Sequence, residues 1–365
     1  MTVTIGFIGL GLIGGSIARA FKANPEADVK IKAFDSDRKA VTLAFEEGVT
    51  DVMVSDIGPD FSDCDYVFLC APIDFNIENA ERLRPYLKDG AVLTDVGSIK
   101  GPMHARIHAL GLDGRFIGGH PMAGSERTGF ANSKAKLLEN AYYIITRTPE
   151  TTDAMVERYE GLVRMMGAIP LVMTPEEHDY ITAAVSHVPH VISASLVNLV
   201  RDSDNPEGEM RMIAAGGFKD ITRISSSSPA MWQQICLGNS ENITKLLGDY
   251  IARLTEIRDG IVSGDSDSLL RFFDSARTYR DSFIDASSGP IKTDNAVHVE
   301  IPDEPGALAI VVTMIASRGI DVKNVGIIHN REVETGSLRI ELHDEKDVKT
   351  VHDMLAAKGY DVTIG

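Results

Sequence analysis

The chain has 365 residues, more than one hydrophobic core usually organises, so two or three domains are predicted and we expect three. Hydrophobic residues make up 44% of the chain and charged residues 24%, which is typical of a folded protein rather than a disordered or fibrous one. The net charge of -17 comes without a basic patch, which argues against nucleic acid or an anionic membrane surface as a partner.

The cysteines and the N-terminal segment indicate a compartment. Cys64, Cys70 and Cys236 are odd in number and lack CxxC or zinc-ligand spacing, so we expect neither a disulfide framework nor a metal site. The N-terminal TVTIGFIG has no basic segment before a long apolar one, and no run of about 18 apolar residues occurs in the chain. We therefore expect a cytoplasmic protein.

Residues 1–173 alternate short apolar runs with amphipathic segments. The apolar runs are TVTIGFI, VKIKAF, YVFLC, AVLTDV, FIGG, YYIIT and IPLVM. This alternation is typical of βαβ units. It predicts an α/β fold: a Rossmann-like, doubly wound and mostly parallel sheet with helices on both faces and a ligand crevice at the carboxyl ends of the strands.

Residues 174–288 predict an all-helical domain. Helical periodicity runs from about 178 to 201, and further helices fit 208–216, 218–224, 229–237 and 239–285. Residues 181–200 are apolar over much of the helix circumference, so we expect them to be buried in this domain or at a subunit interface. ASSGP at 286–290 breaks the pattern as a linker. Residues 296–365 then predict a βαββαβ module, the ferredoxin-like split unit.

A dinucleotide-binding motif lies between the first predicted strand and helix. In Gly9-Leu10-Gly11-Leu12-Ile13-Gly14, the first glycine would make a tight turn, the second would admit the pyrophosphate, and the third would let helix and strand pack. An ordinary strand-to-helix turn is the alternative. Further candidate cofactor-binding residues are Cys70, Ala71, Pro72 and Gly97.

Asp35 closes the second predicted strand, where a carboxylate accepts hydrogen bonds from the adenosine ribose and repels a 2'-phosphate. NAD is therefore favoured as the cofactor. Arg38 is close enough to tolerate that phosphate, so NADP stays open, and Asp35 could instead be a surface helix cap.

The segment GGHPMAGSE, residues 118–126, carries an imidazole and a carboxylate. Because three glycines and a proline favour turns, we expect it to form neither helix nor strand, and catalytic side chains concentrate on such loops. We predict that His120 is a general base. Ser98, which we expect to end the AVLTDV strand, would orient it and donate to a substrate oxygen, which suits hydride removal from an alcohol carbon. A helix N-cap at Ser98 and a structural histidine at 120 are the alternatives.

The helical half supplies two further groups. In SHVPH, residues 186–190, Pro189 is expected to kink the helix; His187 is best explained as a core histidine and His190 is the better functional candidate. GGFKDITRI supplies Lys219 and Arg223, and an arginine fork suits a carboxylate. A salt bridge to Asp220 or to Glu126 is the alternative role for these cations.

GFIGLGLIGGS, DVGSIKG, GGHPMAGSE, HDYITAAVSHVPH and GGFKDITRISSSSPAMW, in this order over residues 1 to about 285, resemble the prephenate dehydrogenase family of tyrosine biosynthesis. The resemblance implies that His120 accepts a hydrogen bond from the C4 hydroxyl of the substrate ring, and that Ser98 bridges this hydroxyl and the nicotinamide. It assigns His190 to the pyruvyl side chain and Arg223 to a carboxylate. Further matching pocket positions are Ser125, Glu126, His178, Ser186, Gly216, Lys219, Ser227 and Trp232.

The resemblance also bears on assembly and regulation. In the family, Trp232 would come from the partner in a homodimer with interlocked helical domains; a core position is the alternative. Residues 296–365 resemble an ACT domain, a module that usually binds an amino acid, and tyrosine is the expected effector; a purely dimerising role is the alternative. Its candidate effector-binding residues are Asp303, Pro305, Gly306, Ala307, Leu308 and Asn324.

We therefore expect NAD-dependent oxidative decarboxylation of prephenate to 4-hydroxyphenylpyruvate. Arogenate, the amino analogue, is the nearest rival substrate, although the resemblance links a histidine at position 190 with prephenate. A β-hydroxyacid dehydrogenase would need a catalytic lysine, for which Lys219 is the only candidate and its setting does not match. An NAD-sensing regulator is the non-enzymatic alternative.

Overall fold

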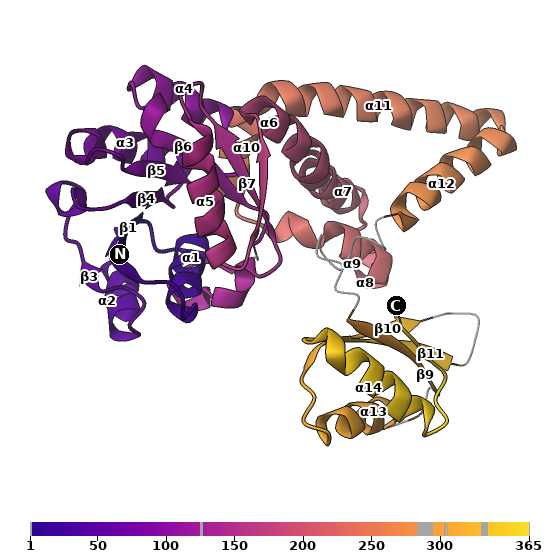
Figure 1. Cartoon of the computed structure of the whole chain (residues 1–365). Coiled ribbons are helices and arrows are strands. Elements are labelled where there is room, and N and C mark those ends of the chain that lie inside the picture. Colours follow the sequence, from indigo (N-terminus) through magenta and orange to yellow (C-terminus); the bar gives the residue numbers. More distant parts are fainter. Residues whose placement is uncertain are drawn as a thin grey trace. The chain divides into compact units, whose positions relative to one another are not determined.

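A computed structural model of the chain describes residues 2–124, 127–282, 295–302, 304, 306–329 and 335–364, with the backbone alone at 327–329 and 335–337. It divides into two compact units, Met1–Arg277 and Thr278–Gly365 (Figure 1). The candidate residues Ser125, Glu126, Asp303 and Pro305 and the expected linker at 286–290 lie outside the described residues.

The first unit contains an eight-stranded sheet in the order β3-β2-β1-β4-β5-β6-β7-β8. Neighbouring strands are parallel except β6 and β7, which are antiparallel. The chain leaves β1 towards β2 on one side and returns to β4 on the other, which places a ligand crevice at their carboxyl ends. The strands are β1 (Val3–Ile8), β2 (Val29–Phe34), β3 (Val52–Met53), β4 (Tyr66–Leu69), β5 (Val92–Asp95), β6 (Phe116–Pro121), β7 (Tyr142–Arg147) and β8 (Ile169–Met173).

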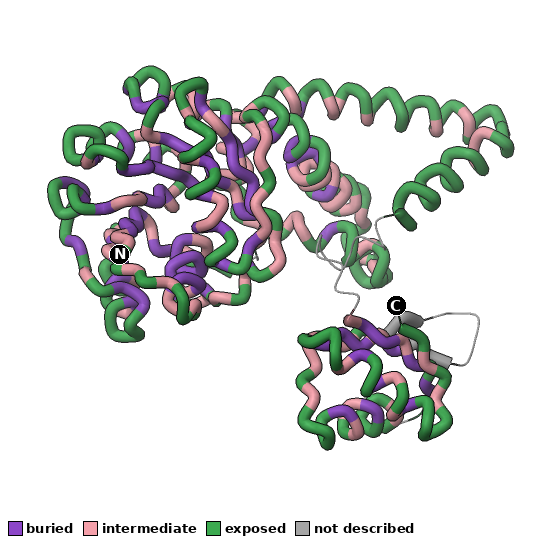
Figure 2. Tube along the Cα trace, in the orientation of Figure 1, coloured by how far each residue is buried: buried purple, intermediate pink, exposed green. Residues whose placement is uncertain are grey.

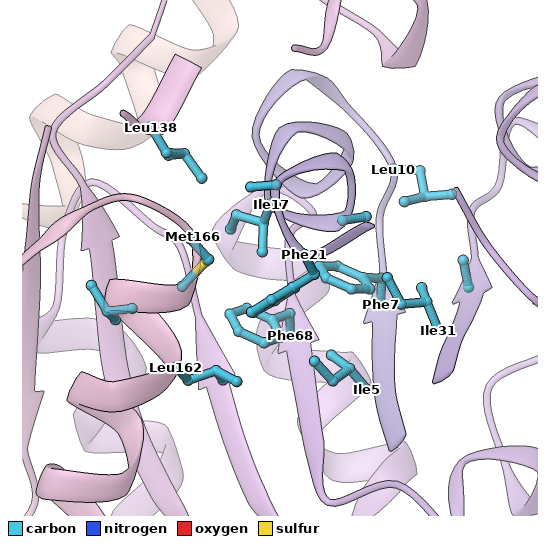
Figure 3. Close-up of a cluster of buried hydrophobic side chains, with 14 of the residues drawn as sticks. Ile5, Phe7, Leu10, Ile17, Phe21, Ile31, Phe68, Leu138, Leu162 and Met166 are labelled. Atoms are coloured by element: carbon cyan, nitrogen blue, oxygen red, sulfur yellow. The ribbon is translucent and has the colours of Figure 1, made fainter. Parts of the chain in front are cut away.

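Helices cover both faces of this sheet, and the predicted Rossmann-like α/β fold is confirmed. One face packs against α1, α2 and α5, and the other against α3 and α4. Figure 3 shows the first of these cores, where Phe7 and Phe68 on adjacent strands stack 5.1 Å apart. The helices are α1 (Leu12–Ala23), α2 (Arg38–Glu46), α3 (Ile73–Leu83), α4 (Gly101–Ala109) and α5 (Asp153–Met165), with short 3-10 turns η1 (Pro59–Phe61), η2 (Arg84–Tyr86), η3 (Asp113–Arg115), η4 (Phe130–Asn132) and η5 (Ala135–Leu138).

The predicted helical domain follows β8, and its all-helical character is confirmed. The single helix expected over 239–285 is wrong, because Gly264 adopts a left-handed conformation (φ 69°) and Asp265 accepts a hydrogen bond from the backbone of Ser268 to start a new helix. The elements are α6 (Pro175–Thr182), a π-helical turn η6 (Ala183–His187), α7 (Val188–Ser203), α8 (Glu209–Ile213), α9 (Gly216–Thr222), the 3-10 turn η7 (Arg223–Ser226), α10 (Pro229–Gly238), α11 (Ser240–Ser263) and α12 (Ser266–Asp281).

Much apolar surface of these helices is not covered within one chain. Pro175–Ser203 is long and apolar enough to span a membrane by length and composition, yet only 22% of its apolar window is buried. Residues 181–200 were expected to be buried either in this domain or at a subunit interface. Within the single chain they are mostly not buried. Figure 2 shows α11 and α12 as largely exposed. The exposed apolar side chains on these helices include Leu254, Ile261, Leu270 and Phe273.

The second unit has the predicted element order β-α-β-β-α-β. Its four strands form an antiparallel sheet in the order β10-β11-β9-β12, packed on two helices through side chains such as Val299, Ile340, Val311 and Leu355. The elements are β9 (Ala296–Pro302), α13 (Ala307–Ala316), β10 (Val322–His329), β11 (Thr335–Leu342), α14 (Glu345–Ala356) and β12 (Val362–Ile364).

Candidate active site

The glycine motif connects β1 to α1 and has the shape that a dinucleotide requires. Gly9 has φ 99°, and a Cβ there would lie 2.7 Å from the carbonyl carbon of Cys70. A Cβ on Gly14 would lie 2.3 Å from the Gly9 oxygen, whereas a Cβ on Gly11 would meet nothing within 4 Å. The space above Gly11, at the N-terminus of α1, fits a pyrophosphate.

Asp35 lies directly after β2 and is bound to the glycine turn. Its Oδ2 accepts a hydrogen bond from the backbone of Leu10 at 2.6 Å, and its Oδ1 accepts one from Asp37 at 2.8 Å. The Arg38 guanidinium donates to the carbonyl of Val54 at 2.8 Å. The Asp35 carboxylate is thus fixed beside the glycine turn, and the Arg38 side chain, which left NADP open as a cofactor, is bonded to the backbone just after β3.

The expectation that residues 118–126 form neither helix nor strand is wrong for the first four, which belong to β6. The two glycines are needed because neighbouring groups approach closely, and not because the chain turns. A Cβ on Gly118 would lie 2.2 Å from Oγ1 of Thr146, and one on Gly119 would lie 2.5 Å from the hydroxyl of Tyr143. His120 thus lies near the end of β6, a strand that packs closely between β5 and β7.

His120 is held by a histidine from the helical domain. Its Nδ1 lies 2.8 Å from Nε2 of His178 on α6, and Nδ1 of His178 lies 2.8 Å from Oδ1 of Asp179. His178 is fully buried. The Asp179 carboxylate also accepts hydrogen bonds from the backbone N–H groups of Lys100 and Gly101, both at 2.8 Å, at the N-terminus of α4.

A buried ion pair lies beneath the same site. Nζ of Lys100 is 2.6 Å from Oδ2 of Asp95 and donates to the carbonyl of Gly119 at 2.7 Å, and neither charged side chain is exposed by more than 1%. The backbone of Gly119 donates in turn to Asp95 at 3.3 Å. This pair joins the end of β5, the start of α4 and the residue before His120.

Burial keeps these imidazoles neutral. Burial, with smaller contributions from His178 and Lys100, lowers the pKa of His120 well below its ordinary 6.5. Burial also lowers the pKa of His178, against the opposing hydrogen bond to Asp179. Although burial raises the pKa of Asp179, its hydrogen bonds from His178, Gly101 and Lys100 hold it below the ordinary value. His120 is therefore unprotonated at neutral pH, as a base must be.

Ser98 lies three residues beyond the end of β5, in the half-buried loop to α4, rather than at the end of the strand itself. It is not the N-cap of that helix; the N-cap position is Lys100, and the Asp179 carboxylate accepts the backbone hydrogen bonds there. Gly97, next to it, donates to Asp95 at 3.0 Å. The capping alternative for Ser98 is therefore wrong.

The SHVPH segment forms the end of the π-helical turn and the start of α7. The helix was expected to kink at Pro189, which lies in the first turn of α7. His187 is buried and lies 3.3 Å from Nδ2 of Asn239. His190 donates from Nδ1 to the carbonyl of Ser186 at 2.9 Å. The ring of Trp232 stacks on His190 of the same chain, with ring centroids 3.8 Å apart. Its expected supply by a partner subunit stays a prediction.

The remaining predicted residues lie on the helical domain's surface. Gly216, Lys219 and Arg223 are exposed along α9 and η7, and Ser227 is half-buried with its hydroxyl donating to the carbonyl of Ile224. Among the described residues, His, Cys, Asp and Glu side chains form no cluster that could hold a metal ion.

Comparison with known families decides where this arrangement belongs. Residues 17–172 match the family described as "Prephenate dehydrogenase, nucleotide-binding domain", and residues 174–275 match "Prephenate dehydrogenase, dimerization domain". The chain belongs to the prephenate dehydrogenase family. The prediction of an NAD-dependent dehydrogenase, made from the glycine motif and Asp35, is thereby confirmed.

Similar proteins of the prephenate dehydrogenase family support the same conclusion. A prephenate dehydrogenase of Bacillus subtilis (strain 168) is 36% identical over 360 residues, covering 98% of this chain and 97% of the relative. One from Lactococcus lactis is 31% identical, covering 98% of each. The solved prephenate dehydrogenase from A. aeolicus, in complex with hydroxyphenyl propionate and NAD+, has a TM-score of 0.73 and 31% identity, covering 77% of this chain and 98% of its own.

Sequence reasoning missed several groups that this prephenate dehydrogenase family member gathers around His120. Asp179, Lys100, Asp95 and Asn239 were not among the candidates, and His178 was named only as a pocket position. A signal existed: Asp179 adjoins His178 in HDYITAAVSHVPH, and Lys100 is a lone cation in DVGSIKG. Neither string shows that the two segments meet.

Proposed function

We propose that this chain catalyses the NAD-dependent oxidative decarboxylation of prephenate to 4-hydroxyphenylpyruvate, as its resemblance to the family implies. The observation that carries the proposal is the setting of His120. This neutral imidazole lies near the end of β6, three strands along the sheet from β1, which precedes the glycine motif, and its Nδ1 is already bonded to His178. Its Nε2 is left to face a substrate hydroxyl.

The residues suit this chemistry. NAD, when bound, accepts the hydride from ring C4 of the substrate. Nε2 of His120 takes the C4 hydroxyl proton as the hydride leaves, the ring carboxylate departs as CO2, and its bonding electron pair enters the ring. The proton then returns to the phenol oxygen, so that none is gained or lost overall. Because the new ring is aromatic, orientation and a base are the main requirements of the site.

The other substrate groups follow from the predicted roles. We assign the pyruvyl side chain to His190 and a carboxylate to Arg223. Nε1 of Trp232 is buried and has no hydrogen-bond partner in the described part of the chain, so it adds a donor beside His190. Ser98 is assigned to the C4 hydroxyl and the nicotinamide. Prephenate is the preferred substrate because of His190, and arogenate is the comparison to make, since a Synechocystis arogenate dehydrogenase is also similar (TM-score 0.68, 27% identity).

The assay is NADH formation at 340 nm with prephenate and, in parallel, arogenate. The substitution His120→Asn should lower kcat by about 100- to 10,000-fold, the usual contribution of a general base, with little change in NAD affinity. An unchanged rate would remove His120 from catalysis. Absence of NADH with either substrate would favour an NAD-sensing regulator.

We also propose a homodimer formed by the helical domain. Its apolar, uncovered helix surfaces and its match to a family dimerization domain support this assembly. A second copy would bury side chains that otherwise face water, such as Leu199 and Ile251, exposed by 62% and 60%. Sedimentation of the purified protein tests it: a monomer at micromolar concentration would contradict the proposal.

The third proposal concerns the second unit, which we assign as a ferredoxin-like ACT domain that binds tyrosine. Its element order and the left-handed Gly306 (φ 94°) before α13 support this assignment. Deleting residues 290–365 should abolish tyrosine inhibition while NADH formation persists, and Asn324→Ala on β10 should weaken inhibition in the full chain. Inhibition that survives the deletion would place tyrosine at the active site instead.

A further inference from the structure

Three acceptor and donor groups from two domains form one chain of hydrogen bonds. Oδ1 of Asp179 accepts from Nδ1 of His178, and Nε2 of His178 faces Nδ1 of His120, each at 2.8 Å. His178 is fully buried and Asp179 is 6% exposed. The T-shaped arrangement of the two imidazoles, with ring centroids 5.0 Å apart, points the nitrogen of one ring at the edge of the other.

The positions of the protons follow from this chain. A carboxylate only accepts, so Nδ1 of His178 carries a hydrogen, and a neutral His178 then has its lone pair on Nε2. Nδ1 of His120 must donate to that lone pair. His120 is consequently the tautomer with hydrogen on Nδ1, and its Nε2 has the free lone pair that a general base needs.

We propose that His178 and Asp179 are positioning residues that select this tautomer of His120, and that Asp179 ties the selection to the docking of the helical domain. The proposal rests on the proposed function for its catalytic consequence and on geometry for the tautomer. It replaces the predicted role of His178 as a substrate-contacting residue.

Asp179 also docks the helical domain on the nucleotide-binding domain. The two oxygens of Asp179 accept hydrogen bonds from the first N–H groups of α4, where a helix attracts negative charge. Asn239 donates to the carbonyl of Asp179 at 2.7 Å from the start of α11. The carboxylate that orients His178 is thus the one that joins α6 to the nucleotide-binding domain.

The hydrogen-bond relay from Asp179 through His178 to His120 also offsets the repulsion between the Lys100 cation and a protonated His120. Among the described residues, the charged and titratable groups around His120 are the Lys100 ammonium with its partner Asp95, the neutral His178 and His187, and the Asp179 carboxylate behind His178. When His120 takes the hydroxyl proton it becomes a cation near Lys100. Its Nδ1–H then donates to His178, whose basicity Asp179 increases, and this interaction stabilises the protonated base.

The test compares two substitutions at one position. In His178→Gln, the amide NH2 can donate to Asp179 while its oxygen accepts from His120, which reproduces the neutral relay without a titratable ring. His178→Met fills similar space with no donor or strong acceptor. We expect kcat of the Gln variant to exceed that of the Met variant by more than about tenfold, at similar NAD affinity and thermal midpoint. Equal kcat values would overturn the proposal.

Asp179→Asn supplies the pH readout. Losing the negative charge weakens His120 as a base, so the acid limb of kcat/KM should move to lower pH while kcat falls. Asn239→Ala is the matched control, because it removes a docking hydrogen bond beside Asp179 and leaves the relay intact. If the control shifts the acid limb equally, the effect is one of docking alone and the tautomer role is refuted.

A readout independent of turnover separates this inference from the proposed function. In protein labelled with 15N-histidine, the His120 signals, assigned by their loss in His120→Asn, should show hydrogen on Nδ1 in the native protein and a mixture of tautomers in His178→Met. Hydrogen on Nε2 in the native protein would overturn the relay even if prephenate is turned over. The expected tautomer without turnover would instead count against the proposed function.

Discussion

Replacing Gly119 by alanine tests the close packing that holds the base. The added Cβ would lie 2.5 Å from the Tyr143 hydroxyl and 2.6 Å from the backbone oxygen of Asp95, whereas an ordinary van der Waals contact of a Cβ is 3.4–4 Å. The neighbours must therefore move by about 1 Å, and overpacking of this kind costs about 1 to 3 kcal/mol of folding free energy. The backbone oxygen of Asp95 cannot rotate away as a side chain could.

The displacement falls on the residue before the base. A misplacement of about 1 Å at a catalytic group can cost about 100-fold in rate, so Gly119→Ala should lower kcat by that order. Urea unfolding and NADH formation with prephenate measure the two effects. Gly124→Ala is the matched control in the same segment, since a Cβ there meets nothing within 4 Å.

A second substitution identifies the clash. Tyr143→Phe removes the oxygen at 2.5 Å but leaves the ring carbon at 2.9 Å and the Asp95 oxygen, so the double variant with Gly119→Ala should recover part of the lost stability. The reasoning is refuted if Gly119→Ala unfolds at the native urea concentration and keeps the native kcat.

Two further predictions concern buried titratable groups. Lys100→Met leaves the Asp95 carboxylate buried without its cation and should lower the free energy of unfolding by about 3 to 5 kcal/mol in urea titrations, with partial recovery on adding Asp95→Asn; full native stability in the single variant would contradict it. Burial lowers the pKa of His104 to about 4, below its unfolded value, so this residue's stabilisation is present above about pH 6.5 and is lost as pH falls towards 4, by up to about 3 kcal/mol. His104→Gln should flatten that part of the stability–pH curve, and an unchanged slope would rule out this source.

The sequence predicted the nucleotide-binding half well because its signals are local. Alternating apolar runs, the glycines at 9, 11 and 14 and the carboxylate at 35 lie within single βαβ units, and each can be recognised in a short window. The break at Gly264 was equally local, since a glycine followed by Asp265 is a helix stop and an N-cap, yet the apolar periodicity on both sides concealed it.

The site was harder because its contacts are long-range. His120 meets His178 across 58 residues, and Lys100 meets Asp179 across 79. Composition correctly indicated something unusual at Gly118 and Gly119, but it could not distinguish a turn from a strand whose neighbours leave no room for a Cβ. Such a distinction depends on which residues of β5 and β7 face the strand.

The proposed base therefore depends on the docking of the two domains of the first unit and not on either domain alone. The nucleotide-binding half contains the glycine turn and Asp35, the residues proposed for NAD binding, and His120 itself. It lacks the group that decides which nitrogen of His120 holds the proton, because that group is His178 on α6. Since Asp179 must accept the α4 N–H groups to stand behind His178, undocking the helical domain removes the helix cap and the tautomer selection together. On the proposed assignment, a site built in this way has a competent base only when the nucleotide-binding and helical domains are in contact.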